Sequence, residues 1–194
     1  MSLEANEVVI GLTGHLYRAP IGTALPANIS TALPAHVWVE LGYTTPDGVT
    51  FSFGRDVNKI MGWQSFEALR VVTTALPKTI KASLLQMNQN TFSSAMGGGY
   101  WTEPTSGKYQ YDPADEDDVD EFVYIVEFTD KGYTYRFIFR RVQNTSGAEF
   151  TVNRNDAVAL PLEVEVLGSN TPGEKPWLLQ TDDPNLGLLA SAGS

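Results

Sequence analysis

The most constraining feature of this chain is an alternation of residue types on both sides of a short turn. One face of residues 121–128 and 133–141 is aromatic or aliphatic, with Phe122, Tyr124, Val126, Phe128, Tyr133, Tyr135, Phe137 and Phe139 as its members. Residues 129–132 (TDKG) supply a turn between the two segments. A period of two residues is that of a β-strand, so the pattern predicts an antiparallel hairpin with its aromatic face buried.

Shorter β signals run through the rest of the chain. Short apolar, β-branched or aromatic runs predict further strands at residues 8–10, 69–74, 79–86 and 157–167. A Thr-Pro-Asp-Gly sequence at 45–48 predicts a turn, and with it a second hairpin over 36–53. Within 157–167, Glu163 and Glu165 share one face and Leu162, Val164 and Val166 share the other.

One short helix is expected at 88–96, with Asn88 as its N-cap and a run of three glycines after its end. Residues 55–69 show no clear period, and Gly62 with its β-branched neighbours argues against helical turns there. The chain is therefore predicted to be mainly β, a β-sandwich with one short flanking helix and extended arms at both ends.

The predicted organisation is one domain with appended segments. Residues 1–168 form the β-sandwich domain, which includes an N-terminal arm at 1–7 and a long loop at 97–120. Residues 169–194 form an extended C-terminal arm that carries a cluster of Trp177, Leu178 and Leu179. Such apolar clusters indicate docking onto a neighbouring subunit or onto the chain's own domain.

The charge of the chain is strongly negative and unevenly placed. There are 13 Lys and Arg against 23 Asp and Glu, a net charge of −10, which disfavours binding to DNA or to an anionic membrane. Residues 112–121 hold seven of these acids. They are interpreted as a solvated loop or as a surface that repels an anion. A calcium loop is disfavoured, because Asp117 stands where an EF-hand needs Gly.

No catalytic or cofactor site can be assembled from the sequence. The chain has no Cys and only two histidines, His15 and His36. It contains no HExxH, GxSxG or phosphate-loop motif, and the three glycines at 97–99 precede Tyr100 where a phosphate loop has Lys. We therefore expect no enzyme activity, no metal and no cofactor. The acidic first 14 residues and the lack of a long apolar run favour a protein made in the cytoplasm, with no membrane partner.

Several stretches together resemble the major tail proteins, or tail tube proteins, of long non-contractile-tailed bacteriophages of actinobacteria. The likeness covers roughly residues 7–168 and depends on the order and spacing of its parts, which are 14–26, 38–43, 47–49, 54–57, 63–65, 70–72, 81–97, 153–157 and 160–162. The resemblance implies a structural subunit of the virion tail, with a β-sandwich fold and one helix.

The resemblance also implies an assembly. Six subunits would close a ring by continuing β-sheets from one subunit to the next, and loops and arms would join stacked rings. The phage genome would pass down the bore at ejection without specific binding. A tape-measure protein and tail assembly chaperones are the other partners that the resemblance implies, and synthesis would take place in the host cytoplasm. An acidic bore would suit this task, because it repels phosphates.

Two sets of residues are the candidates for this assembly. Glu127, Glu163 and Glu165 are the hypothetical lining of the bore, with outward solvent or cross-strand pairs with Arg136 and Arg140 as the alternative. The hypothetical contacts between subunits or rings are Trp101, Tyr109, Trp177, Leu178 and Leu179.

Two other functions stay open at this stage. One is another phage structural protein, a tail terminator or a capsid decoration protein. The second is a carbohydrate-binding β-sandwich, for which Trp101, Tyr109 and Tyr111 could supply an aromatic platform.

Overall fold

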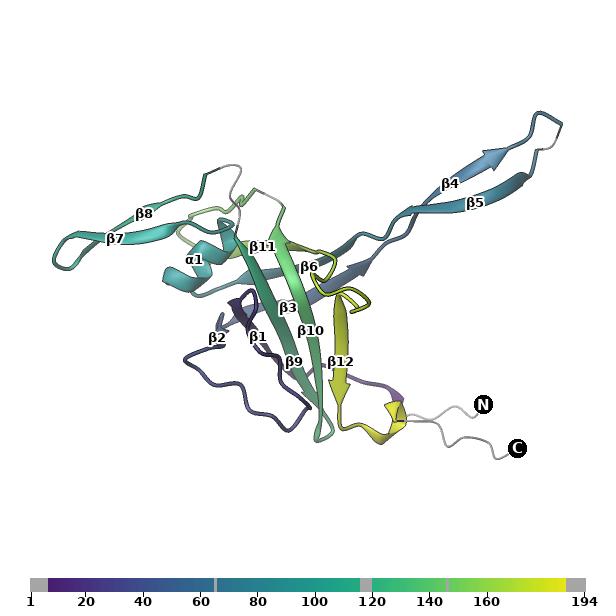
Figure 1. Ribbon diagram of the computed structural model, residues 1–194. Coiled ribbons are helices and arrows are strands. Elements are labelled where there is room, and N and C mark those ends of the chain that lie inside the picture. The colour runs from purple at the N-terminus through teal and green to yellow at the C-terminus, as the bar shows by residue number, and fades with distance from the viewer. Residues whose placement is uncertain (1–6, 65, 116–119, 146, 188–194) are drawn as a thin grey trace. The chain divides into compact units, whose positions relative to one another are not determined.

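The computed structural model in Figure 1 describes residues 7–64, 66–115, 120–145 and 147–187. The described residues are mainly β-strand with one short α-helix, which confirms the predicted fold class. The chain divides into two compact units of interleaved segments. The first unit comprises Met1–Tyr43, Glu121–Val142 and Gly168–Ser194, and the second comprises Thr44–Asp120 and Gln143–Leu167.

The first unit is built on an antiparallel sheet around the predicted hairpin. Its strands are β1 (Thr13–Pro20), β2 (Val39–Glu40), β9 (Glu121–Asp130), β10 (Tyr133–Asn144, of which the last two residues belong to the second unit) and β12 (Trp177–Thr181). Their order is β2-β1-β9-β10, and β12 pairs with β10. The turn between β9 and β10 consists of Lys131 and Gly132, which both have positive φ, as a two-residue hairpin turn requires.

Both faces of the β9–β10 hairpin are buried, although the sequence predicted burial only for the aromatic one. Ile125 and Ile138 are 0% exposed on the opposite face, where they form a core with Ala19, Trp38 and Val123. Residues 21–38, here called the covering segment, pack Leu25, Leu33 and Val37 against that core. The second face is buried because Val123, Ile125 and Ile138 make it apolar as well.

The second unit contains three neighbouring strands of the eight-stranded sheet and two separate ribbons. The three strands have the order β11-β6-β3, from β11 (Leu160–Val166), β6 (Lys78–Leu84) and β3 (Thr44–Phe53). The ribbons pair β4 (Asp56–Met61) with β5 (Ala68–Ala75) and β7 (Tyr100–Thr105) with β8 (Lys108–Asp112). In Figure 1 the β4–β5 ribbon continues from β3 and β6 as an arm.

The helix α1 (Gln89–Ala95) begins where the sequence predicted. The Asn88 side chain accepts hydrogen bonds from the backbone N–H groups of Asn90 and Thr91, which fixes the first turn. Gly97, at φ 84°, follows its end. The side-chain amide of Asn144 donates to the last helical carbonyls, those of Ser94 and Ala95, and the helix packs against β11.

Two local predictions are wrong. Residues 36–53 do not form a hairpin: β2 pairs with β1, and β3 pairs with β6. The turn sequence 45–48 instead lies inside β3, where Gly48 has φ 69° and the register with β6 shifts. The same residue types that make a turn thus make a bulge, because an antiparallel partner continues past them. Residues 8–10 form no strand.

Two predicted irregular segments contain strands. The β7–β8 ribbon lies within the expected loop 97–120, and β12 lies within the expected C-terminal arm 169–194. Within the acidic run 112–121, the structure describes 112–115, 120 and 121, and the remaining acids lie outside the described residues.

Candidate assembly surfaces

The β4–β5 ribbon of the second unit exposes many large apolar side chains. Every residue of both strands is exposed. The exposed large apolar residues of the ribbon and its tip are Val57, Ile60, Met61, Trp63, Phe66, Leu69, Val71 and Val72. At the tip, Trp63 is 98% exposed and Phe66 is 103% exposed. A patch of this kind on a protein surface marks an interaction site.

Close backbone packing sets the base of this ribbon. The Gly54 N–H donates to the Pro77 carbonyl at 2.8 Å, which closes the β3–β6 pair before the ribbon begins. A Cβ atom on Gly54 would lie 2.9 Å from the Pro77 ring. Only glycine therefore fits at this position, and the ribbon extends from a fixed base. Sequence reasoning missed this surface, because an alternation pattern does not reveal that both of its faces are exposed.

The β7–β8 ribbon turns two of its aromatic residues toward α1. Trp101 and Tyr111 meet Phe92 edge-on at centroid distances of 5.7 and 5.0 Å, and the Trp101 indole N–H donates to the Ser93 hydroxyl. Tyr109, by contrast, is exposed. Of the two predicted contact residues on this ribbon, Trp101 anchors it to the helix and Tyr109 is available to a partner. The three-residue platform of a carbohydrate-binding module is not formed.

The predicted C-terminal contact residues pack mainly on their own unit. Trp177 stacks on Phe137 at 6.1 Å, and Leu178 packs against the core of the first unit. Leu179 is the exposed member of the three. This is the arrangement that the sequence left as the alternative to docking on a neighbour, and it makes β12 an integral strand of the sheet.

Hydrogen bonds to the start of β10 hold the segment after β12. The Asp182 carboxylate accepts from the Thr134 N–H, and the Asp183 carboxylate accepts from the Tyr135 hydroxyl. This hydrogen bond, with burial and the nearby carboxylates, raises the pKa of Tyr135 to about 12. The same bond lowers the pKa of Asp183, which also caps a 3-10 turn at Pro184–Leu186. On the N-terminal side, Asp130 accepts from the Ile10 N–H.

The three acids predicted to line a bore lie in different surroundings. Glu127 pairs with Arg136 at 2.6 Å, and their side chains are only 20% and 6% exposed. The Arg136 guanidinium also donates to the Asn28 and Thr31 carbonyls of the covering segment. Glu127 therefore takes part in the cross-strand pair that the sequence offered as the alternative to a place in the bore.

Glu163 and Glu165 lie together on the polar face of the β11-β6-β3 sheet. Across the strands, Glu163 is in register with Lys81 and Thr50, and Glu165 is in register with Thr79 and Ser52. Glu163 forms a partly exposed ion pair with Lys81 at 2.8 Å. The face is thus rich in hydroxyl groups and slightly acidic, whereas Leu162 and Val164 on the other face are buried.

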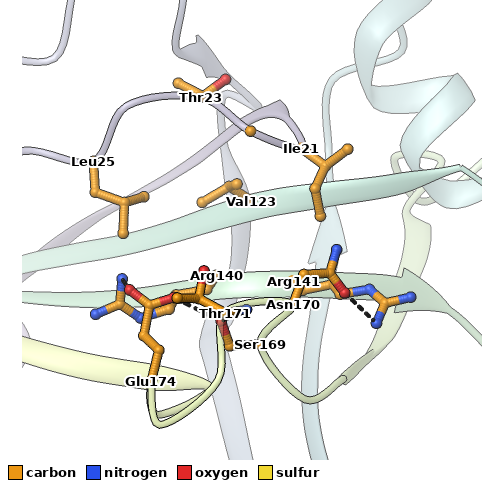
Figure 2. A pocket seen from close by; sticks show the side chains of 11 residues that line it. Ile21, Thr23, Leu25, Val123, Arg140, Arg141, Ser169, Asn170, Thr171 and Glu174 are labelled. Carbon is orange, nitrogen blue, oxygen red and sulfur yellow. Dashed lines mark hydrogen bonds and ion pairs between the residues drawn. The ribbon is translucent and has the colours of Figure 1, made fainter.

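A pocket of about 270 Å³ opens in the first unit (Figure 2). The covering segment forms one side with Ile21, Thr23 and Leu25, and the 169–174 loop forms the other. Two adjacent arginines of β10 lie between them. Arg140 pairs with Glu174, and Arg141 pairs with Glu121 and donates to the Asn170 side chain. The Arg140 Nε is buried, and it has no hydrogen-bond partner among the described residues.

The edge of β3 is a further surface for association. Among the described strands β3 pairs only with β6, so its second edge faces no other described strand. Such an edge can accept a strand from another chain. Pro46 and the register shift near Gly48 interrupt this edge near its start.

The described residues hold no group of three or more His, Cys, Asp or Glu side chains placed to bind a metal ion. Within the same residues, no helix has the length and apolar character needed to cross a membrane. The surfaces that stand out are an exposed apolar ribbon, an unpaired strand edge and a small basic pocket. Together they define a β-rich structural subunit with surfaces suited to association.

Comparison with known families agrees with this class. A family model described as phage tail tube protein matches residues 1–186, which is nearly the whole chain. The chain belongs to the phage tail tube protein family, and it is a structural protein of the phage tail. No curated protein matches it.

Proposed function

We propose that this protein is the repeating subunit of a phage tail tube, which closes into six-membered rings that stack around a bore for DNA. Family membership and the exposed β4–β5 ribbon support this proposal. Exposure of Trp63 and Phe66 to water does not stabilise a lone subunit, whereas a polymer can bury such side chains at each contact between subunits.

In this proposal two different surfaces make the contacts between subunits. The outer edge of β3, the last strand in the sheet order, continues the sheet into the next subunit around the ring, because strand addition there needs only a second strand edge. The β4–β5 ribbon reaches a different copy and joins it through apolar side chains. The exposed Tyr109 and Leu179 add contacts at the rim of the interface.

The bore is proposed to be lined by the Glu163 and Glu165 face. This face has hydroxyl groups and a small excess of negative charge, so it offers DNA no cluster of cations and no release of counterions. The tape-measure protein and the assembly chaperones remain proposed partners. Synthesis in the host cytoplasm is proposed on the same basis.

Electron microscopy of the purified protein tests the assembly. Hollow filaments are the expected result. Isolated rings would instead indicate a tail terminator, and monodisperse monomers would contradict a self-assembling tube.

A ribbon deletion tests the role of the arm. Because the Gly54–Pro77 hydrogen bond already closes the β3–β6 pair, residues 56–75 can be replaced by an Asn-Gly turn with the sheet retained. We expect this variant to keep its β circular dichroism and to form no filaments. Filaments of normal length from the folded variant would show that the ribbon is not an assembly element. A matched control shortens the β7–β8 ribbon around Gly107.

A further inference from the structure

We propose that the pocket of the first unit is a socket for the side chain of Trp63 from a second copy of this chain. The proposal rests on the proposed tube function and adds to it the site at which the ribbon binds. Three properties of the pocket lead to this occupant: its size, the chemistry of its walls and one unpaired hydrogen-bond donor.

The size of the pocket suits a single side chain. Pockets for cofactors and drug-sized ligands occupy roughly 300–1,000 Å³, and the 270 Å³ here falls just below that range. All the described residues that line the pocket belong to the first unit. The first unit thus presents a complete receptor for one large group.

The walls of the pocket match an aromatic ring better than they match an anion or an aliphatic chain. Ile21, Leu25 and Val123 provide an apolar wall, and the Arg140 guanidinium provides a flat cation (Figure 2). Arginine stacks favourably on aromatic faces, and Trp is the best partner for such a contact. The carboxylate of Glu174 opposes entry of a free anion. It can also accept a hydrogen bond from an indole N–H.

The buried Arg140 Nε has no hydrogen-bond acceptor among the described residues. A buried donor without a partner is costly, and such groups are rare in native proteins. The neighbouring Arg141 shows the contrast, because its Nε donates to Glu121 at 2.7 Å. At the ribbon tip, the backbone carbonyls beside Trp63 and the side-chain carbonyl of Gln64 are acceptors. Because the Arg140 Nε is shielded from solvent, one of them would pair with it once the Arg140 side chain turns toward the entering ring.

The ribbon tip supplies the fitting group. Trp63 and Phe66 are both fully exposed, but only Trp combines a large ring with a hydrogen-bond donor. Trp paired with Arg is a typical combination at the energetic centre of an interface. Phe66 would then lie at the rim, where its truncation has a smaller effect.

Cysteine cross-linking tests the socket. Because the chain has no native Cys, every disulfide that forms must join introduced cysteines. Gln64→Cys at the tip and Thr171→Cys at the pocket rim are made as separate single variants, because Gln64 and Thr171 are exposed. Equal amounts are mixed, assembled and oxidised. We expect a disulfide-linked dimer from the mixture and from neither variant alone. The matched control replaces the second partner by Ser106→Cys, on the turn of the other ribbon.

A second substitution tests the anchor itself. Trp63→Ser in the Gln64→Cys chain should lower the cross-linked fraction by about tenfold or more, the scale of a central interface residue, and Phe66→Ser should lower it less. Tubes that form without a 64–171 cross-link above the Ser106→Cys control would overturn the socket and leave the tube function intact. Wild-type protein that never assembles would overturn both. A Gln64→Cys/Thr171→Cys double variant that cross-links only within one chain would assign the contact to a single copy and overturn the proposal.

Discussion

Arg136 connects three parts of the first unit at a single side chain. It pairs with Glu127 on β9 and donates to two carbonyls of the covering segment, and it is almost fully buried. Arg136→Met removes the cation, so Glu127 loses its ion pair and the Thr31 carbonyl loses this donor, whereas the Asn28 carbonyl keeps the Thr31 N–H. We expect a loss of about 3 kcal/mol in the free energy of unfolding, at the low end for a broken buried pair because Glu127 is partly exposed.

Urea unfolding of Arg136→Met measures this loss. Lys81→Met is the matched control, since its pair with Glu163 is largely open to water and should contribute at most ~1 kcal/mol. Equal losses in the two variants would show that Arg136 does not hold the covering segment.

The Tyr135–Asp183 hydrogen bond gives the fold a dependence on pH at both extremes. The pKa of Tyr135 is raised from 10.0 to about 12 in the folded chain, so its stabilising effect is complete below pH 10 and is lost as the pH rises through about 12. The pKa of Asp183 is lowered from 3.8, so its contribution is present above that value and is lost as the pH falls through the folded pKa.

Tyr135→Phe tests the alkaline part of this dependence. The variant should be less stable than wild type at neutral pH, and the difference should shrink between pH 10 and 12, as measured by urea midpoints. Tyr109→Phe is the control because Tyr109 is exposed. A constant difference across that pH range would rule out the hydrogen bond as its source.

At the scale of elements, the β7–β8 ribbon depends on Gly99. This residue has φ 84°, and a Cβ atom there would lie 2.6 Å from both the Asp112 carbonyl and the Tyr111 hydroxyl. Gly99→Ala should therefore combine backbone strain of ~1–2 kcal/mol with ~1–3 kcal/mol of steric clash. Near-ultraviolet circular dichroism should weaken as Trp101 loses its fixed packing on α1.

Gly107→Ala separates the two causes. Gly107 has φ 74° at the other end of the same ribbon, and a Cβ atom there would meet nothing within 4 Å. It should show the backbone strain alone, with the aromatic signal of Trp101 unchanged. If both alanine variants lose equal stability, close packing at Gly99 contributes nothing.

The elements that could be predicted from sequence are those whose signal is local. Three such features are confirmed: the β9–β10 hairpin, the Asn88 cap and the alternation on β11. Each depends on residues that are close together in the chain. The turn predicted at 45–48 is wrong because a bulge and a turn favour the same residue types. The choice between them depends on β6, about thirty residues away.

The assembly surfaces were harder to predict because exposure is a property of the folded unit. Trp177 precedes two leucines and Trp63 stands between Gly62 and Gln64, yet Trp177 stacks on Phe137 and Trp63 is fully exposed. The sequence therefore favoured the C-terminal cluster as a contact and missed the ribbon tip. The pocket was equally hidden, since its lining comes from three separate segments of the chain.

At the scale of the whole molecule, the net charge of −10 affects both the contacts between subunits and any contact with DNA. Subunits of like charge repel, so contacts between them have to come from apolar groups and strand edges. If the tube conducts DNA as proposed, the same repulsion would also keep DNA from binding to its wall. If Glu163 and Glu165 face the bore, their position matters more than the total charge.

Two charge-matched double variants separate position from total charge. Glu163→Lys/Glu165→Lys changes the polar face of the β11-β6-β3 strands, and Glu7→Lys/Glu149→Lys makes the same change in net charge at exposed sites outside these strands. Assembled tubes are pelleted with a short fluorescent DNA duplex. Only the first variant should retain DNA, and the retention should fall as salt is raised, because new lysines bind phosphates by releasing counterions. Equal retention by both variants would place the two glutamates outside the bore, and the resistance of the tube to DNA would then come from its total charge.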